Sequence, residues 1–281
     1  MKILACDTSE ASCGGAVTDN IKVLGSSFLS VGMTHSQTFM PLLHDLMLRM
    51  PLSYQDLDAF ACTVGPGSFT GIRIGLSALK AMAFAANKPL IPVSSLRALA
   101  HPLLNSADAL VVPMIDARNQ RVFASAYFRG EEVISEQAAH IEDLVRMCDA
   151  WRDANAPGTT IKTCGNACHM YRVGRELLMK NQEVSEFSDE NVSQTKCDIS
   201  QAVETDFIEI DRYVAIDPVS VAVLAQEIIS QYVADISTDA RATVFSKDNI
   251  KNTPFAPGVV MPSYLAKTSA ERQREAKMET C

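Results

Sequence analysis

Short apolar runs alternate with turn residues over the first thirty positions of the chain. Residues 2–7, 13–18 and 22–29 are rich in aliphatic and small side chains, and Asp19 and Asn20 stand where a tight hairpin turn is favoured. Such runs, separated by turn residues, are typical of strands. We therefore expect three consecutive strands that form an antiparallel meander at one edge of a mixed sheet.

Helical periodicity follows this meander. Thr34 and Gln37 fit a capping box, in which the hydroxyl accepts from the backbone and the amide reaches back to it. Apolar residues then recur at helical spacing up to residue 50. The core stripe consists of Phe39, Leu42, Leu43, Leu46 and Met50, and it is widened by Met40 and Met47. The helix therefore carries more apolar surface than one sheet face needs.

A glycine-rich loop stands between an apolar segment and a second helical segment. Residues 58–64 are typical of a buried strand, residues 65–71 contain three glycines and one proline, and residues 72–86 have helical composition. Only an arginine, a serine and a lysine are clearly polar in this second helix. A helix that is apolar nearly all round is covered on more than one side, so we expect that the chain's own sheet does not cover it fully.

The glycine loop has two interpretations. Free backbone N–H groups at a helix N-terminus attract anions, so the loop is a candidate for a weak nucleotide site. The residues that would form this site are Asp7, Ser9, Gly65, Gly67 and Ser68. No Lys-Ser/Thr pair follows the last glycine, which excludes a Walker A loop. The other interpretation, a rigid turn that aims the second helix, is the one we favour.

Strand signals start again near residue 101 and predict a second domain. We expect a first domain over residues 1–100 and a second, smaller and more divergent one over residues 101–281, whose final helix is a candidate for packing back on the first. Asp116 and Arg118 either face an interdomain cleft or form a local ion pair in a turn. The elements expected in the second domain are strands at 110–115, 121–128, 159–165 and 208–210, helices at 141–151, 169–179 and 219–232, and a polar loop at 181–206.

Composition narrows the functional classes. The chain has 281 residues, 47 % hydrophobic and 21 % charged, with a formal net charge of −8, which is ordinary for a globular protein. An acidic chain without a basic run is a poor nucleic-acid binder on its own. No export signal is apparent, no stretch approaches the roughly 20 apolar residues of a membrane span, and the eight cysteines are typical of reduced thiols. These features predict a cytoplasmic protein with no membrane contact.

Several motifs together resemble one protein family. They are residues 3–9 (ILACDTS), 34–36 (THS), 40–43 (MPLL), 65–75 (GPGSFTGIRIG), 92–96 (PVSSL), 116–118 (DAR) and 262–265 (PSYL). The chain resembles the TsaB (YeaZ-like) family, bacterial proteins for threonylcarbamoyladenosine biosynthesis on tRNA. The resemblance is dense over residues 1–130 and sparse beyond, and the motif at 65–75 is long and specific.

The resemblance implies a fold and a role. The fold is α/β, two-domain and actin-, sugar-kinase- and Hsp70-like (ribonuclease H-like), with mixed sheets flanked by helices. The role is a non-catalytic scaffold that binds a TsaD-like (Kae1/Gcp) catalytic subunit, joined by a TsaE-like ATPase, for modification of adenosine 37 in tRNAs that read codons beginning with A. No cofactor is then held tightly: ATP or ADP acts in the assembled complex, the metal belongs to the partner, and tRNA is bound only through the complex.

The metal ligands of the catalytic relative are missing from this chain. Ser95 and Leu99 stand where the family's catalytic paralogue has the two imidazoles of a His-x-x-x-His motif, and neither is a good ligand for iron or zinc. Cys164, Cys168 and His169 form the one metal-like cluster, without a fourth ligand, and are interpreted as structural. The alternative function is an enzyme in its own right, metallopeptidase-like or carbamoyl-transferring.

The surplus apolar surface predicts where a partner binds. We expect the helices at 35–50 and 71–86 to form the partner surface, which also pairs with a second copy when the partner is missing, because either arrangement covers the exposed apolar side chains. Arg73 is expected as a polar contact within this surface. The full set of interface candidates is His35, Phe39, Leu43, Met47, Arg73, Ile74, Ala78 and Ala81.

Overall fold

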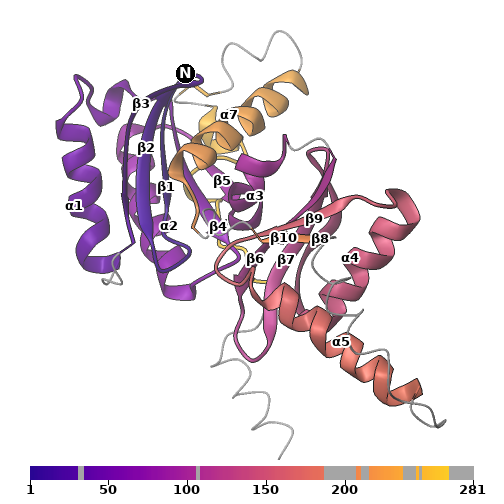
Figure 1. Ribbon diagram of the computed structural model, residues 1–281. Coiled ribbons are helices and arrows are strands. Elements are labelled where there is room, and N and C mark those ends of the chain that lie inside the picture. The colour runs from indigo at the N-terminus through magenta and orange to yellow at the C-terminus, as the bar shows by residue number, and fades with distance from the viewer. Residues whose placement is uncertain are drawn as a thin grey trace, which may run out of the picture. The chain divides into compact units, whose positions relative to one another are not determined.

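The computed structural model of the chain divides into two compact units. The first comprises Met1–Ala98 and Ile216–Cys281 and the second Leu99–Ala215 (Figure 1). The described residues are 1–30, 35–105, 108–186, 207–209, 215–236, 245–246 and 249–265. The expected capping residue Thr34, residues 187–206 of the predicted loop and the segment beyond residue 265 lie outside them.

The division corrects the expected boundary at the C-terminal side. Helix α7 (Pro218–Ala234) packs against the strands of the first sheet, so the first unit is built from both ends of the chain. Asp217 caps this helix, since its carboxylate accepts from the Val219 backbone N–H at 2.9 Å, and Pro218 occupies the first turn, where its missing N–H costs nothing. The predicted second domain of 101–281 therefore ends at residue 215.

The first unit contains a five-stranded mixed sheet in the order β3-β2-β1-β4-β5. Its strands are β1 (Lys2–Asp7), β2 (Cys13–Asp19), β3 (Lys22–Leu29), β4 (Ala59–Gly65) and β5 (Leu90–Ser94). Strands β1 to β3 pair antiparallel, whereas β4 and β5 run parallel to β1. Asn20 takes a φ of 52° in the β2–β3 turn, as its short polar side chain allows. The predicted edge meander is confirmed.

Helices cover both faces of this sheet. Helices α1 (His35–Leu48) and α2 (Phe69–Ala86) pack on one face and α7 on the other (Figure 1). Adjacent residues of β2 face opposite sides of the sheet. A side chain at Gly15 would meet Leu43 of α1 on one face, and a side chain at Gly14 would meet Pro218 of α7 on the other. A short 3-10 helix, η1 (Tyr54–Asp56), precedes β4, and another, η4 (Ile250–Asn252), follows α7.

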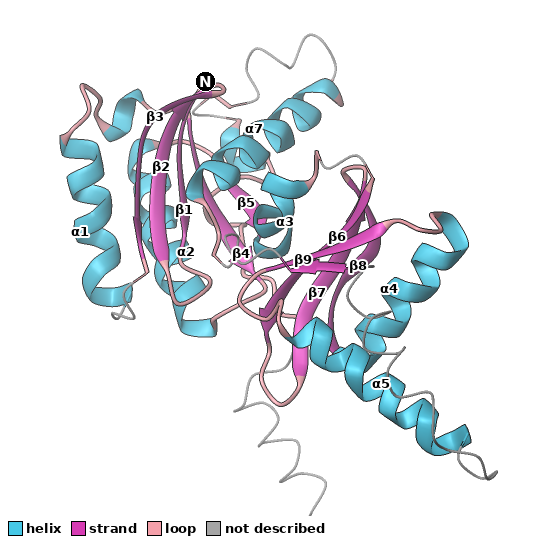
Figure 2. Cartoon of the chain, in the orientation of Figure 1, coloured by secondary structure: helices cyan, strands magenta, loops and turns pink. Residues whose placement is uncertain are grey.

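The second unit contains another five-stranded sheet, in the order β10-β9-β6-β7-β8. Its strands are β6 (Ala109–Asp116), β7 (Arg121–Phe128), β8 (Glu131–His140), β9 (Thr160–Cys164) and β10 (Phe207–Glu209). Helices α4 (Ile141–Asn155) and α5 (Met170–Glu186) share an apolar core with one face of this sheet (Figure 2). Helix α5 runs seven residues beyond its predicted end, into the segment expected as loop. Helix α3 (Ser95–Ala100) and the 3-10 helix η2 (His101–Leu103) span the boundary between the units.

Helix α2 has an unusual composition. Among the described residues it alone is long and apolar enough to cross a membrane by length and composition, and 39 % of it is buried within the protein. The expectation that no stretch approaches a membrane span was therefore too strict by this criterion. A core helix satisfies the same criterion, so this single helix is weak support for a membrane span.

Candidate functional site

The glycine loop packs against the end of β1. The Ser68 backbone N–H donates to the Ser9 carbonyl at 2.6 Å, and the Thr8 hydroxyl donates to the Gly71 carbonyl at 2.8 Å. A side chain at Gly67 would collide with the Ser9 carbonyl, and one at Gly71 with that of Thr8. Because they have no side chains, the two glycines allow the backbone of residues 8 and 9 to approach closely. This packing favours the interpretation of the loop as a rigid turn. The predicted nucleotide site stays a prediction.

The turn starts helix α2 earlier than its sequence predicts. Ser68 is the N-cap, with its hydroxyl accepting from the Gly71 backbone N–H at 3.2 Å, so the helix begins at Phe69 rather than at residue 72. Gly65 has a φ of 120°, which L side chains rarely adopt. A side chain there would also strike the Ser263 carbonyl.

Asp7 and Glu10 place two buried carboxyl groups beside this turn. One Asp7 oxygen accepts from the Ser9 backbone N–H at 3.1 Å, from its hydroxyl at 2.7 Å and from the Thr63 hydroxyl at 2.6 Å. Burial raises the pKa of Asp7 in spite of these donors. Burial, followed by the charge of Asp7, raises the pKa of Glu10 to about 8. The three donors therefore bind the Asp7 carboxyl group into the structure of the turn.

The two residues that stand in place of the metal-binding histidines are buried. Ser95 is 0 % exposed and Leu99 is 1 % exposed. No group of three or more His, Cys, Asp or Glu side chains that could hold a metal ion occurs among the described residues. Cys164 and Cys168 are buried thiols, and the Cys164 thiol donates to the Leu99 carbonyl at 3.8 Å.

Asp116 and Arg118, expected either at a cleft or as an ion pair in a turn, lie at the turn between β6 and β7. The Asp116 carboxylate accepts from the Arg118 backbone N–H at 2.7 Å, and Arg118 has a φ of 63°. The carboxylate therefore stabilises the β6–β7 turn through a backbone donor.

Three of the predicted interface residues on α1 are core residues. Phe39, Leu43 and Met47 are 0 %, 0 % and 5 % exposed, so their prediction as partner contacts was wrong. Helix α1 lies directly on β2, where the absent side chain of Gly15 leaves room that Leu43 fills. The exposed large apolar residues of this helix are Met40 at 45 % and Leu48 at 69 %.

The remaining interface candidates are at least partly accessible. His35 is half-buried, with Nε2 3.0 Å from the Ser12 carbonyl. Ile74 and Ala78 are half-buried against the core of the first unit, whereas Ala81 is exposed. The most exposed large apolar side chain on α2 is Phe84, at 78 %, and sequence reasoning missed it. Its position in an almost wholly apolar helix was the available signal.

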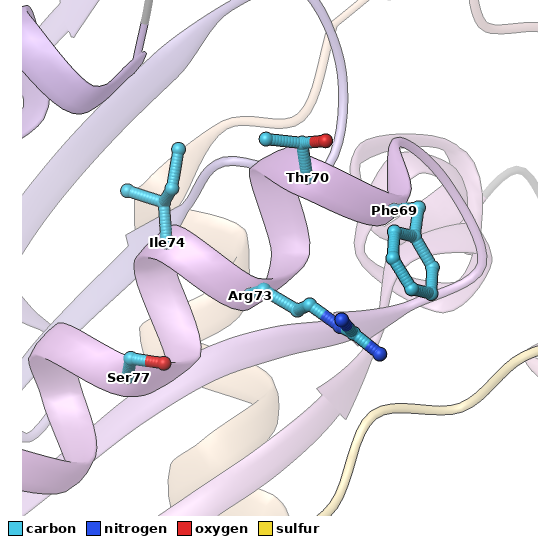
Figure 3. Close-up of a pocket in the computed structure, with 5 residues that line it drawn as sticks. All are labelled: Phe69, Thr70, Arg73, Ile74 and Ser77. Carbon is cyan, nitrogen blue, oxygen red and sulfur yellow. The ribbon is translucent and has the colours of Figure 1, made fainter.

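Arg73 joins α2 to the C-terminal part of the chain. Its guanidinium carbon lies 3.7 Å from the centroid of the Phe69 ring, and its Nε donates to the Tyr264 hydroxyl at 3.1 Å. The Phe69 and Tyr264 rings are 5.1 Å apart. The Ser263 backbone N–H donates to the Val64 carbonyl at 2.7 Å, which holds this segment beside the turn. An open depression of about 450 Å³ (Figure 3) is lined by Phe69, Thr70, Arg73, Ile74 and Ser77.

Comparison with known proteins gives consistent matches. A family model described as "TsaD: tRNA N6-adenosine threonylcarbamoyltransferase" matches residues 30–279. The tRNA threonylcarbamoyladenosine biosynthesis protein TsaB of Bacillus subtilis is 33 % identical over 151 residues, 52 % of this chain and 66 % of that protein. The TsaB protein of Haemophilus influenzae is 32 % identical over 160 residues, 52 % of this chain and 67 % of that protein. The chain therefore spans about two thirds of the length of these relatives.

Solved structures support the fold. YeaZ from Pseudomonas aeruginosa matches with a TM-score of 0.58 at 24 % identity, covering 82 % of this chain and 93 % of that one. A protein described as similar to peptidase YeaZ from the same organism matches with a TM-score of 0.61 at 22 % identity, covering 94 % and 99 %. The predicted α/β fold class, with two mixed sheets flanked by helices, is confirmed.

Proposed function

Because this chain belongs to the TsaB (YeaZ-like) family, within the wider group that the TsaD model describes, we propose that it acts in tRNA threonylcarbamoyladenosine biosynthesis as a non-catalytic scaffold. Its proposed partner is a TsaD-like catalytic subunit, with a TsaE-like ATPase completing the assembly. The modified position is adenosine 37 of tRNAs that read codons beginning with A. The TsaB names of the relatives support the pathway.

The uncovered apolar surface of α1 and α2 carries this proposal. Met40, Leu48 and Phe84 expose 45 %, 69 % and 78 % of their surfaces. Both helices already pack their other faces on the first sheet, so intramolecular packing is complete without these side chains. Large apolar side chains left exposed on a surface are typical of a protein interface. A second copy of the chain is the occupant that we propose when the catalytic subunit is missing.

The chemistry is assigned to the partner. Ser95 and Leu99 supply no metal ligands, and the proposal therefore places the metal on the catalytic subunit and ATP or ADP in the assembled complex. The net charge of −8 opposes binding of a polyanion, so tRNA is proposed to bind only through the complex.

Reconstitution tests this function. Formation of threonylcarbamoyladenosine on a tRNA transcript is measured with purified TsaD-like and TsaE-like proteins from the same organism, with ATP and a threonylcarbamoyl adenylate as the group donor, in the presence and absence of this chain. We expect modification only when all three proteins are present, and none from this chain alone. Modification by this chain alone would make it the enzyme, and full modification without it would remove it from the pathway.

The surface is tested in the same assay with two glutamate variants. Phe84→Glu should abolish the stimulation by this chain, because it replaces an exposed apolar contact by a charged group that is costly to desolvate on binding. Ile21→Glu is the matched control, since Ile21 is 90 % exposed in the β2–β3 turn. Equal activity of the two variants would place the interface elsewhere.

A further inference from the structure

We propose that Arg73 binds a carboxylate on a helix of the catalytic partner, and that Tyr264 is the positioning residue for its guanidinium. The inference rests on the proposed function and adds the chemistry of the surface that the partner presents. It also makes the segment around Tyr264, which is far from α2 in sequence, a contributor to partner binding.

The guanidinium is held before any partner binds. The Phe69 ring lies against one face of it, with 3.7 Å from the guanidinium carbon to the ring centroid, and the Tyr264 hydroxyl accepts from its Nε at 3.1 Å. Within the described part of the chain, no hydrogen bond or ion pair engages the two Nη groups. A planar fork of donors that is already oriented loses little conformational entropy when it binds an anion.

The charge of α2 is opposite to that of the whole chain. The helix contains Arg73 and Lys80 and no acidic residue, whereas the net charge of the protein is −8. Residues seven positions apart lie about two turns, or about 10 Å, apart on the same side of a helix. Charge complementarity therefore favours an acidic segment, with one carboxylate at Arg73 and a second near Lys80.

The surface beside these cations suits a helix. Ser77 and Ala81 are exposed and Ala78 is half-buried, so a partner backbone can approach closely. The open depression next to Arg73 is lined by Phe69 and Ile74 together with two hydroxyl side chains. Figure 3 shows Arg73 extending from α2 alongside Phe69, away from Ile74. Apolar contact at this place would exclude water and strengthen the pairing with a carboxylate.

The same guanidinium geometry also fits a phosphate, and the charge distribution decides between the two. A strand of RNA brings many phosphates, most of which would meet the acidic remainder of the molecule. A helix with one or two carboxylates places its charge only at the cations of α2. We therefore take the acidic helix as the occupant and RNA as an outcome of the test.

The test measures the affinity of the full chain for the TsaD-like subunit of the same organism at low and high salt. We expect Arg73→Ala to bind about tenfold more weakly at low salt, with a smaller ratio at high salt because ions screen the pairing. Arg129→Ala is the matched control, since Arg129 is exposed and lies 5.0 Å from the centroid of the Phe128 ring in the second unit. This control should bind like the wild type.

Tyr264 is tested separately from packing. Tyr264→Phe keeps the ring against Phe69 but removes the acceptor for the Arg73 Nε. We expect an intermediate, salt-dependent loss of affinity with an unchanged melting temperature. A residue with only a packing role would give wild-type affinity in the Phe variant, and that result would overturn the assignment of Tyr264.

The outcomes separate this inference from the proposed function. If the wild type binds and Arg73→Ala binds equally well at both salt concentrations, the inference is wrong and the scaffold function stands. If the wild type does not bind the catalytic subunit at all, both are wrong. If Arg73→Ala loses binding of tRNA by this chain alone and keeps the partner affinity, the ligand is RNA and the acidic helix is excluded.

Discussion

Asp7 connects three parts of the first unit through one carboxylate oxygen. This oxygen accepts from the backbone and hydroxyl of Ser9 in its own turn and from the Thr63 hydroxyl of β4. Asp7 is 1 % exposed, and these donors satisfy the hydrogen-bonding capacity of that one oxygen. The turn that faces the glycine loop is held in place by this carboxyl group.

Thr63→Val tests this role of Asp7. The change keeps the shape of the side chain and removes its donor, which should lower the free energy of unfolding by about 1–3 kcal/mol. Ser230→Ala is the control, because the hydrogen bond from the Ser230 hydroxyl to the Gln226 carbonyl, at 2.8 Å, is exposed. Its effect should stay below about 0.5 kcal/mol. Denaturant unfolding measures both variants, and equal losses would contradict the structural role.

Glu10 predicts how stability depends on pH. Its pKa is raised from 4.5 to about 8 by burial, so between these values the folded chain keeps a proton that the unfolded chain has released. The free energy of unfolding should therefore fall as pH rises from about 5 to 8. The raised pKa of Asp7 acts in the same direction.

Glu10→Gln should flatten this dependence and stabilise the protein at pH 8 relative to the wild type. Glu131→Gln, at an exposed position of β8, should leave it unchanged. Thermal melting across the pH range distinguishes the two variants. A wild-type slope retained in Glu10→Gln would assign the pH dependence to other groups.

The sequence identified the glycine loop and Asp7 but not what surrounds them. The contact from Thr8 to Gly71 spans 63 positions and the one from Arg73 to Tyr264 spans 191. Spacing along the chain carries no signal for such pairs. From the sequence alone, we therefore expected the backbone N–H groups of the loop to be free. In the structure, the Ser68 backbone N–H donates to the Ser9 carbonyl.

At the scale of elements, helical periodicity located α1 within two residues but not its exposed face. The wide apolar stripe of α1 includes residues that contact the sheet and residues that face away from it. Leu43 is the one that packs into the space left by the absent side chain of Gly15 in β2. Strand β8 was missed for a related reason. Its ten residues are mostly exposed or half-buried, so they lack the apolar run that marks a buried strand.

Two alanine substitutions on α1 test the corrected face. Leu43→Ala removes a side chain that is 0 % exposed and should lower the free energy of unfolding by about 2–5 kcal/mol. Leu48→Ala, at 69 % exposure, should change it by less than about 0.5 kcal/mol while weakening partner binding. Denaturant unfolding is the measurement. A large loss of stability in Leu48→Ala would show that Leu48 belongs to the core.

At the scale of the whole molecule, the first unit is discontinuous. All five strands of its sheet lie before residue 95, and one of the helices that cover the sheet, α7, lies after residue 215. The restart of strand signals near residue 101 indicated a boundary there. The return of a final helix to the first domain was a candidate from the sequence, and the packing of α7 against β1 and β2 assigns this helix to the first unit.

The exposed apolar side chains also predict the state of the isolated chain. We expect it to form a homodimer through α1 and α2 in the absence of the catalytic subunit, since pairing buries Leu48 and Phe84. Sedimentation equilibrium should show a dimer for the wild type and a monomer for Leu48→Glu. Addition of the catalytic subunit should replace the homodimer by a heterocomplex. A Leu48→Glu dimer as stable as that of the wild type would exclude this surface.

The central claim is that the face of α2 binds the catalytic partner. Calorimetric titration of the TsaD-like subunit with Phe84→Glu and with Ile21→Glu tests it most directly, because both variants place a charge on a highly exposed apolar position. The account predicts wild-type affinity for Ile21→Glu and a loss of at least about a hundredfold for Phe84→Glu, since an unpaired charge is costly to bury. Wild-type affinity for Phe84→Glu, with its fold intact, would contradict it.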